Sequence, residues 1–93
     1  MNQNTARIQG EKLLQTSLLI VEDEEAHAEL IRLAFEAYPE FSLQFANTLK
    51  KARKLLTESH FDLILADWLL PDGNGLSLVS EDSSESSTPV VVM

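Results

Sequence analysis

Acidic residues follow two short apolar runs of this sequence, and their placement suggests chemistry. Glu22 and Asp23 come directly after the run 18–21, and Asp67 comes directly after the run 61–66. If both runs are strands that lie parallel and adjacent, the three carboxylates converge at one edge of a sheet. Such a hard-oxygen site suits Mg²⁺, and an aspartate placed there can act as a nucleophile toward phosphorus.

Each of these acids also has a simpler explanation. Glu22 and Asp23 fall where a helix is expected to begin, and acids at that end stabilise a helix by about 0.3–1 kcal/mol each. Asp67 precedes a turn and would serve there as a capping residue. The joint pattern favours the site, because turn capping does not need an apolar strand before it.

The strands that must position these acids are visible as apolar runs. Residues 17–21 and 61–66 are apolar at nearly every position, which predicts strands buried on both faces of a parallel sheet. Residues 41–45 alternate between apolar and polar, as in a half-buried strand at or near a sheet edge, and residues 89–93 form a last β-branched run. Helical patterns separate these strands, so we expect right-handed crossovers and a doubly wound α/β fold.

Two amphipathic helices are predicted between the strands. The first spans residues 24–38 and ends at Pro39, and its apolar positions are Ala28, Leu30, Ile31, Ala34, Phe35 and Tyr38. The second follows a cap at Asn47 or Thr48, and its inward positions are Leu49, Ala52, Leu55 and Leu56. A short helical pattern continues at 76–79, and the serine-rich and acidic residues 80–87 are expected to form a flexible loop.

Composition limits the class of protein. The 93 residues, 44% of them hydrophobic, suit one compact domain over 17–93 after a flexible leader at 1–16. The absence of cysteine excludes disulfides and fits the cytoplasm, and no signal peptide or membrane span is expected. The net charge of −8 argues against nucleic-acid binding. A basic cluster over 50–54 is either a docking patch for an acidic partner or, as we favour, a solvated helix face.

The segments 19–24, 66–75 and 88–93 together resemble the receiver domain of bacterial two-component response regulators, a flavodoxin-like module. The resemblance implies the strand order 2-1-3-4-5, with the fifth strand and the last helices absent from this chain. It also implies that Asp67 is the phosphorylated aspartate. Glu22, Asp23, Asp67 and the backbone carbonyl of Leu69 would hold Mg²⁺.

The same resemblance implies a function and partners. The chain would accept a phosphoryl group from a histidine kinase or a phosphotransfer protein and signal by a change of shape, without being a turnover enzyme. An output domain or a homodimer would receive the signal. Pro71 and Gly75 are then expected to shape the loop, Gly75 by tolerating a positive φ. Asp72 is expected to be a solvated turn residue rather than a fourth ligand. Trp68 is either a lid or an ordinary exposed aromatic.

The sequence departs from the family's pattern after the fourth strand. It has neither the Ser or Thr that reads the phosphate nor the lysine that follows, and the lysines at 50, 51 and 54 are expected to lie on a face away from the pocket. The alternative is therefore a binding module that works without phosphorylation. A haloacid-dehalogenase-like phosphatase is rejected, because position 69 is Leu where those enzymes resemble Asp-x-Asp. His27 and His60 are expected at the surface.

A bare edge at the last strand and an uncovered face beside the first helix are also expected from the missing elements. Both features recruit a neighbour. We therefore expect the 93 residues either to form a dimer or to be followed by further residues.

Overall fold

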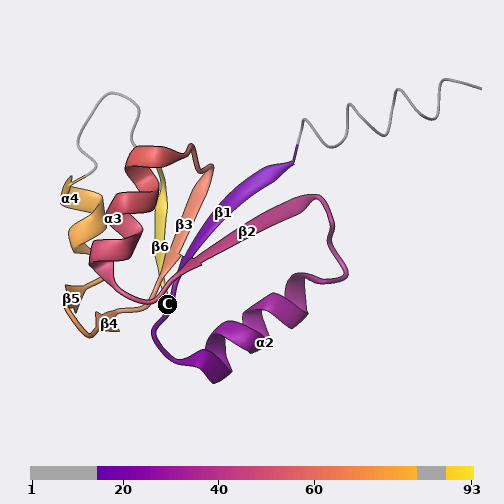
Figure 1. The fold of residues 1–93 in the computed structure, drawn as a ribbon, viewed down its shortest axis with the longest axis horizontal. Helices are drawn as coiled ribbons and strands as arrows, with labels where there is room; N and C mark the ends of the chain where they lie inside the picture. The colour runs from indigo at the N-terminus through magenta and orange to yellow at the C-terminus, as the bar shows by residue number, and fades with distance from the viewer. Residues whose placement is uncertain (1–14, 82–87) are drawn as a thin grey trace, which may run out of the picture.

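The computed structural model describes residues 15–81 and 88–93. Within them, four parallel strands form one sheet in the order β2-β1-β3-β6 (Figure 1). The strands are β1 (Thr16–Val21), β2 (Phe41–Ala46), β3 (Leu63–Ala66) and β6 (Val90–Val92). This order and direction confirm the predicted doubly wound α/β fold, with β2 at an edge.

The register of the sheet brings the carboxyl ends of its central strands level. Val21, the last residue of β1, pairs with Ala46 of β2 and Ala66 of β3. The backbone N–H of Glu22 donates to the carbonyl of Ala46 at 2.9 Å, and that of Asp67 donates to Val21 at 3.0 Å. The acids that follow the strands are therefore held side by side by sheet hydrogen bonds.

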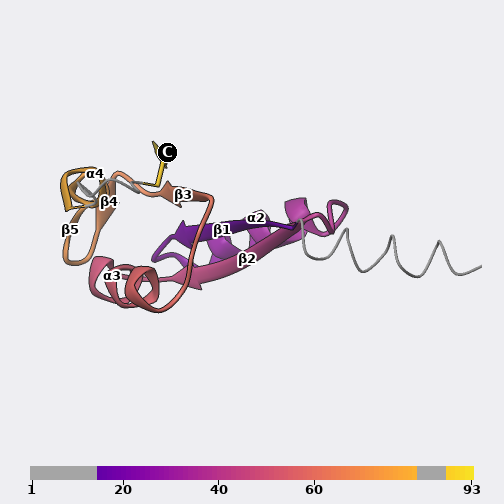
Figure 2. The ribbon, with the colours of Figure 1, turned by 90° about the horizontal axis from the view of Figure 1, so that it is seen from above.

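Among the described residues, three helices flank the sheet: α2 (Glu25–Phe35), α3 (Leu49–Glu58) and α4 (Ser77–Glu81). Helices α3 and α4 cover one face and α2 lies on the other (Figures 1 and 2). Helix α2 ends three residues before Tyr38, where we predicted its end. Its last turn tightens, with Tyr38 donating to the carbonyl of Phe35 at 2.9 Å, because Pro39 disfavours helical backbone at the residue before it.

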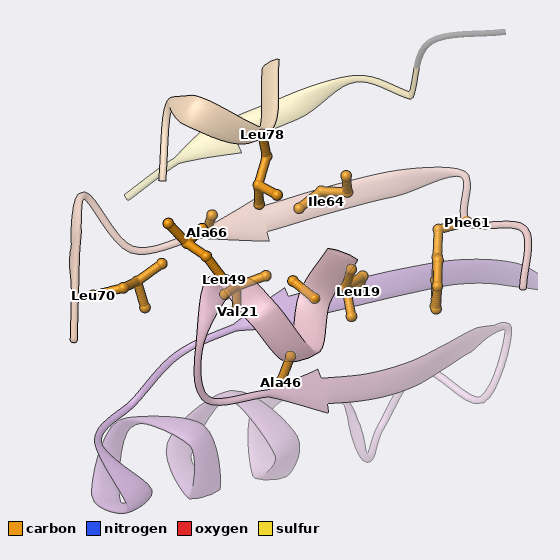
Figure 3. Packing of buried hydrophobic residues seen from close by; sticks show 10 residues of the cluster. Leu19, Val21, Ala46, Leu49, Phe61, Ile64, Ala66, Leu70 and Leu78 are labelled. Carbon is orange, nitrogen blue, oxygen red and sulfur yellow. The ribbon is translucent and has the colours of Figure 1, made fainter. Parts of the chain in front are cut away.

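The hydrophobic core lies between the sheet and the helices α3 and α4. Its strand residues alternate, so that Leu19 and Val21 of β1 face α3 (Figure 3). The predicted inward positions of α3 are confirmed, with two buried and two packed against the core. The buried cluster consists of Leu19, Val21, Ala46, Leu49, Ala52, Phe61, Ile64, Ala66, Leu70 and Leu78.

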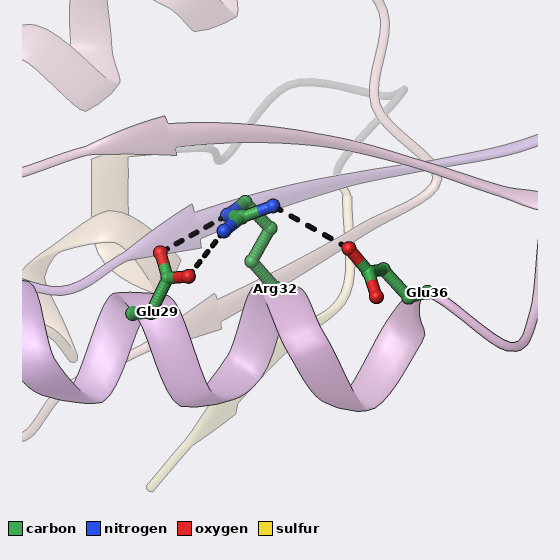
Figure 4. A network of polar contacts seen from close by, with 3 residues as sticks. All are labelled: Glu29, Arg32 and Glu36. Carbon is green, nitrogen blue, oxygen red and sulfur yellow. Dashed lines mark hydrogen bonds and ion pairs between the residues drawn. The ribbon is translucent and has the colours of Figure 1, made fainter.

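The opposite face of the sheet is covered less completely. Helix α2 has no buried residue, and Leu30 is 64% exposed although its position belongs to the apolar stripe. An open hollow of about 530 Å³ is lined by residues of α2 and by Phe45 of β2. The charged side chains of Glu29 and Arg32 line this hollow, on the side of α2 that faces the strands, and Arg32 bridges Glu29 and Glu36 (Figure 4). The amphipathic pattern thus gave the helix correctly but overstated how much of it is buried.

The segment after Asp67 contains two strands that the sequence did not suggest, and then the short helix expected at 76–79. Strands β4 (Leu69–Leu70) and β5 (Gly73–Asn74) pair antiparallel as a small hairpin, and α4 follows. Ser80 and Glu81 belong to α4, although a loop was expected from residue 80. The rest of that loop, 82–87, and most of the leader, 1–14, lie outside the described residues. No helix among those described is long and apolar enough to cross a membrane.

Candidate metal and phosphoacceptor site

Three carboxylates meet at the carboxyl ends of β1 and β3. Glu22, Asp23 and Asp67 each offer an oxygen within 4.8 Å of the other two. The first two leave β1 and the third leaves β3, and the level register of these strands sets their spacing. The structure therefore brings together the three acids that the sequence singled out.

Glu22 is the buried member of this group. Its side chain is only 3% exposed, and its Oε2 accepts a hydrogen bond of 3.1 Å from the backbone N–H of Glu24. The Nδ1 atom of His27 lies 3.7 Å from the same oxygen, and Nε2 lies 3.5 Å from Glu24. One oxygen of this buried carboxylate therefore lies close to both a backbone N–H group and an imidazole nitrogen.

The crowding of acids changes the ionisation of Asp67. Partial burial, followed by a hydrogen bond to Glu22 and the charges of Glu22 and Asp23, raises the pKa of Asp67 to about 6, while His27 lowers it. A group with this pKa is largely ionised above pH 7 and holds its proton in mild acid. At neutral pH Asp67 is thus ionised, although the neighbouring negative charges disfavour its ionised form.

This donor set fits a divalent cation with a preference for oxygen. Carboxylates with one open side are the ligands that Mg²⁺ usually takes from a protein, which leaves room for water or a phosphoryl oxygen. After burial, the hydrogen bond to Glu22 and the negative charges of Glu22 and Asp23 also raise the pKa of Asp67, and such an ion would offset these charges.

Two glycines shape the loop that follows Asp67, each for a different reason. A Cβ atom at Gly75 would come within 2.1 Å of the carbonyl oxygen of Asp67. The positive φ, 146°, belongs to Gly73, and Gly75 has none. The expectation that Gly75 serves by a positive φ is therefore wrong: Gly75 is needed for close approach of the backbone, and Gly73 supplies the unusual conformation. Pro71 lies in the turn between β4 and β5.

Asp72 has a structural role that the sequence analysis missed. Its two carboxylate oxygens accept hydrogen bonds from the backbone N–H groups of Leu49 at 2.8 Å and Lys50 at 3.0 Å. These bonds lower the pKa of Asp72. Asp72 is exposed in the turn between β4 and β5, as expected, and does not belong to the cluster of three acids. Its hydrogen bonds to α3 were not foreseen. Thr48, one of the two predicted caps, accepts from Lys51 at 3.1 Å.

Lys51 lies nearer to the acids than we expected. It lines a hollow of about 230 Å³ together with Glu22, Asp23 and Asn47. Asp67 does not line this hollow. The expectation that these lysines lie on a face away from the pocket of the three acids therefore stays a prediction, with Lys51 beside two of those acids. The signal for this placement was its position in the first turn of a helix whose preceding strand ends beside β1.

The remaining candidates lie at the surface. Trp68 is 49% exposed and Leu69 is 71% exposed. The side chain of His60 is 84% exposed and lies 3.3 Å from Asp62, at the other end of the sheet, while that of His27 is 57% exposed. The prediction of two surface histidines is confirmed, but the contact of His27 with Glu22 was not foreseen.

Comparison with known proteins gives a consistent result. The model of the "Response regulator receiver domain" matches residues 18–93. The methanogenesis regulatory protein FilR1 of Methanothrix harundinacea is 38% identical over 81 residues, and the response regulator protein PilR of Pseudomonas aeruginosa is 38% identical over 76. These matches cover 82% and 81% of this chain but only 18% and 17% of the relatives, so the chain spans less than a fifth of their length.

A solved structure agrees with the sequence relatives. The MaeR response regulator bound to beryllium trifluoride superimposes with a TM-score of 0.76 at 30% identity, over 85% of this chain and 66% of that one. The family match includes residues of each of the four strands of the main sheet and the three clustered acids. The chain belongs to the response regulator receiver domain family.

Proposed function

We propose that this chain is a phosphoacceptor domain in which Asp67 takes a phosphoryl group from a phosphohistidine. The donor is a histidine kinase or a phosphotransfer protein. The observation that carries the proposal is the approach of three carboxylate oxygens within 4.8 Å of one another at the carboxyl ends of parallel strands, in a chain that belongs to the receiver family.

The residues of the chain have separate roles in this reaction. An ionised oxygen of Asp67 attacks phosphorus in line, the P–O bond forms as the P–N bond of the phosphohistidine breaks, and the imidazole nitrogen keeps the electron pair. The product is an acyl phosphate on Asp67. Because the pKa of Asp67 is about 6, the attacking form dominates at neutral pH.

Glu22, Asp23, Asp67 and the backbone carbonyl of Leu69 would hold Mg²⁺. When bound, the ion offsets the charge of the carboxylates and of the phosphoryl oxygens. We place the domain in the cytoplasm, in keeping with its lack of cysteine. It transmits a change of shape to an output domain or a second copy, and it does not turn over a substrate as an enzyme does.

A small phosphodonor tests the proposal directly. We expect incubation with acetyl phosphate and Mg²⁺ to add one phosphoryl group to the intact mass, and hydroxylamine to remove it. Asp67→Asn should abolish the label, whereas Asp62→Asn, at the other end of the sheet, should keep it. A label that persists in Asp67→Asn would place the acceptor elsewhere. An unlabelled wild type that still binds a kinase would support the phosphorylation-independent binding module.

Beryllium trifluoride offers a second probe, since it has the charge and shape of a phosphoryl group. The relative MaeR is described with this molecule bound. We expect it to bind the present chain only when Mg²⁺ is added and Asp67 is intact.

A further inference from the structure

Asp72 fastens the loop after the proposed phosphoacceptor to helix α3. Both of its carboxylate oxygens accept from N–H groups of the first two residues of α3, Leu49 and Lys50. The first N–H groups of a helix have no partner within the helix, so a side chain from elsewhere can take them. Thr48 supplies a separate, local cap to Lys51. The first turn of α3 is therefore capped twice, by the neighbouring Thr48 and by Asp72, which lies 23 residues after Leu49.

Two further contacts hold the β4–β5 hairpin against α3. Leu70 of β4 is 8% exposed and belongs to the same buried cluster as Leu49. On the other strand, a Cβ atom at Gly73 would lie only 2.8 Å from Cδ1 of Leu49. Both strands of the hairpin thus pack against Leu49, the first residue of α3: Leu70 precedes Asp72 in the chain and Gly73 follows it.

The other end of this loop is fixed to the proposed phosphoacceptor. The N–H of Gly75 donates to the carbonyl of Trp68 at 3.0 Å, and the backbone of Gly75 touches the carbonyl of Asp67. Leu69 lies between these two attachments, one residue beyond Trp68. The position of the Leu69 backbone is therefore set by the contacts of Gly75 with Trp68 and Asp67 and by the contacts of the hairpin with α3.

We propose that Asp72 is a positioning residue that holds the backbone at Leu69 in the conformation needed for metal binding by fastening the β4–β5 hairpin to α3. The inference rests on the proposed metal site. It gives α3 a part in that site, because a shift of its first turn would move the hairpin. Asp72 acts through the hairpin and does not itself bind the ion.

Two alanine variants separate this role from ordinary helix capping. Asp72→Ala removes the tie between hairpin and helix, whereas Thr48→Ala removes only the local cap of the same helix. Both should lower the melting temperature. In the metal-free protein, Asp72→Ala should speed amide hydrogen exchange over 69–75 about tenfold, and Thr48→Ala should not. Mg²⁺ titration followed by Trp68 fluorescence should give a Kd raised about 3–10-fold in Asp72→Ala and within twofold of wild type in Thr48→Ala.

Asp72→Asn serves as the conservative variant. It keeps one acceptor oxygen for Leu49, so exchange and Kd should fall between those of wild type and Asp72→Ala. Equal exchange and equal Kd in the two alanine variants would overturn the inference while the metal site stands. If wild type shows no saturable Mg²⁺ binding, or if Asp67→Ala binds as well as wild type, the proposed metal site fails and the inference with it.

Discussion

The backbone of Gly75 touches the carbonyl oxygen of Asp67, where a Cβ atom would approach to 2.1 Å. No side chain fits there unless the peptide that follows Asp67 moves. We expect Gly75→Ala to displace this peptide, to weaken Mg²⁺ binding at least tenfold and to abolish labelling by a phosphodonor, while the far end of the sheet remains folded. Titration by Trp68 fluorescence and intact mass measure the two effects.

Gly73→Ala is the matched control for that variant. It introduces a positive φ at a residue with a side chain and a contact of 2.8 Å with Leu49, so it should lower stability. Because Gly73 lies away from Asp67 but helps to seat the hairpin on α3, we expect Mg²⁺ binding to weaken as in Asp72→Ala. Phosphodonor labelling at saturating Mg²⁺, at a temperature where the variant is folded, should survive. Loss of labelling in Gly73→Ala but not in Gly75→Ala would contradict this account of the two glycines.

The stability of the metal-free protein should fall as pH rises through about 6. A carboxyl whose pKa is raised on folding stabilises the fold below its unfolded value, 3.8, and this contribution is lost as pH passes the folded value of about 6. Asp67→Asn removes the penalty. We expect the variant to exceed wild type at pH 8 by about 1 kcal/mol, a figure reduced for solvent screening at a partly exposed group.

Urea denaturation at pH 4.5 and pH 8 measures this difference. Mg²⁺ should reverse the order at pH 8, because it stabilises wild type and not Asp67→Asn. A wild type that is more stable than the variant at pH 8 without metal would contradict the raised pKa.

Asp62 should show the opposite dependence on pH. Its Oδ2 accepts from the backbone N–H of Ser17 at 2.7 Å, and this bond, with a smaller effect of His60, lowers the pKa of Asp62. A lowered pKa gives stability that is present above the unfolded value of 3.8 and is lost as pH falls through the folded value. Asp62→Ala should therefore lower the melting temperature at pH 7 and have a smaller effect at pH 3. An equal effect at both pH values would show that the charge is irrelevant.

Leu78 should account for most of the stability that α4 contributes. It is 1% exposed and packs in the main core, whereas its neighbour Val79 is 50% exposed. We expect Leu78→Ala to cost about 2–5 kcal/mol of the free energy of unfolding and Val79→Ala less than about 0.5 kcal/mol. Equal losses in urea denaturation would mean that α4 is not packed as described.

Lys51 should weaken cation binding at the three acids. It shares a hollow with Glu22 and Asp23, so its positive charge opposes that of Mg²⁺ at low ionic strength. We expect Lys51→Met to lower the Kd for Mg²⁺ about twofold, and more at low salt than at high salt. Lys54→Met is the control, because the Lys54 side chain is 74% exposed and lies 4.0 Å from Glu58. A change of the same size in Lys54→Met would argue against a local effect.

The sequence was sufficient for the features that depend on local pattern. The strands were visible because residues such as Leu19 and Ile20, both 0% exposed, are apolar on consecutive positions. Such a run is typical of a strand that is buried on both faces. The meeting of Glu22 with Asp67 followed from parallel strands whose carboxyl ends are level. Neither conclusion needed side-chain detail.

Other features depend on contacts between distant parts of the chain. Asp72 lies in a polar turn, and no residue near it in the sequence indicates that it accepts a hydrogen bond from Leu49. The two glycines of the turn look equivalent until the backbone shows which one touches Asp67 and which has a positive φ. The exposure of Leu30 depends on what packs against α2, and helix periodicity does not contain that information.

The weak burial of α2 has a consequence for how the molecule opens. A helix without a buried side chain can unfold by itself, since its loss leaves the core beneath α3 intact. We expect its amides to exchange through a local fluctuation well before the sheet does, in a step that denaturant hardly accelerates. Because α2 begins three residues after Glu22, such a fluctuation would loosen the chain beside the acids without breaking β1.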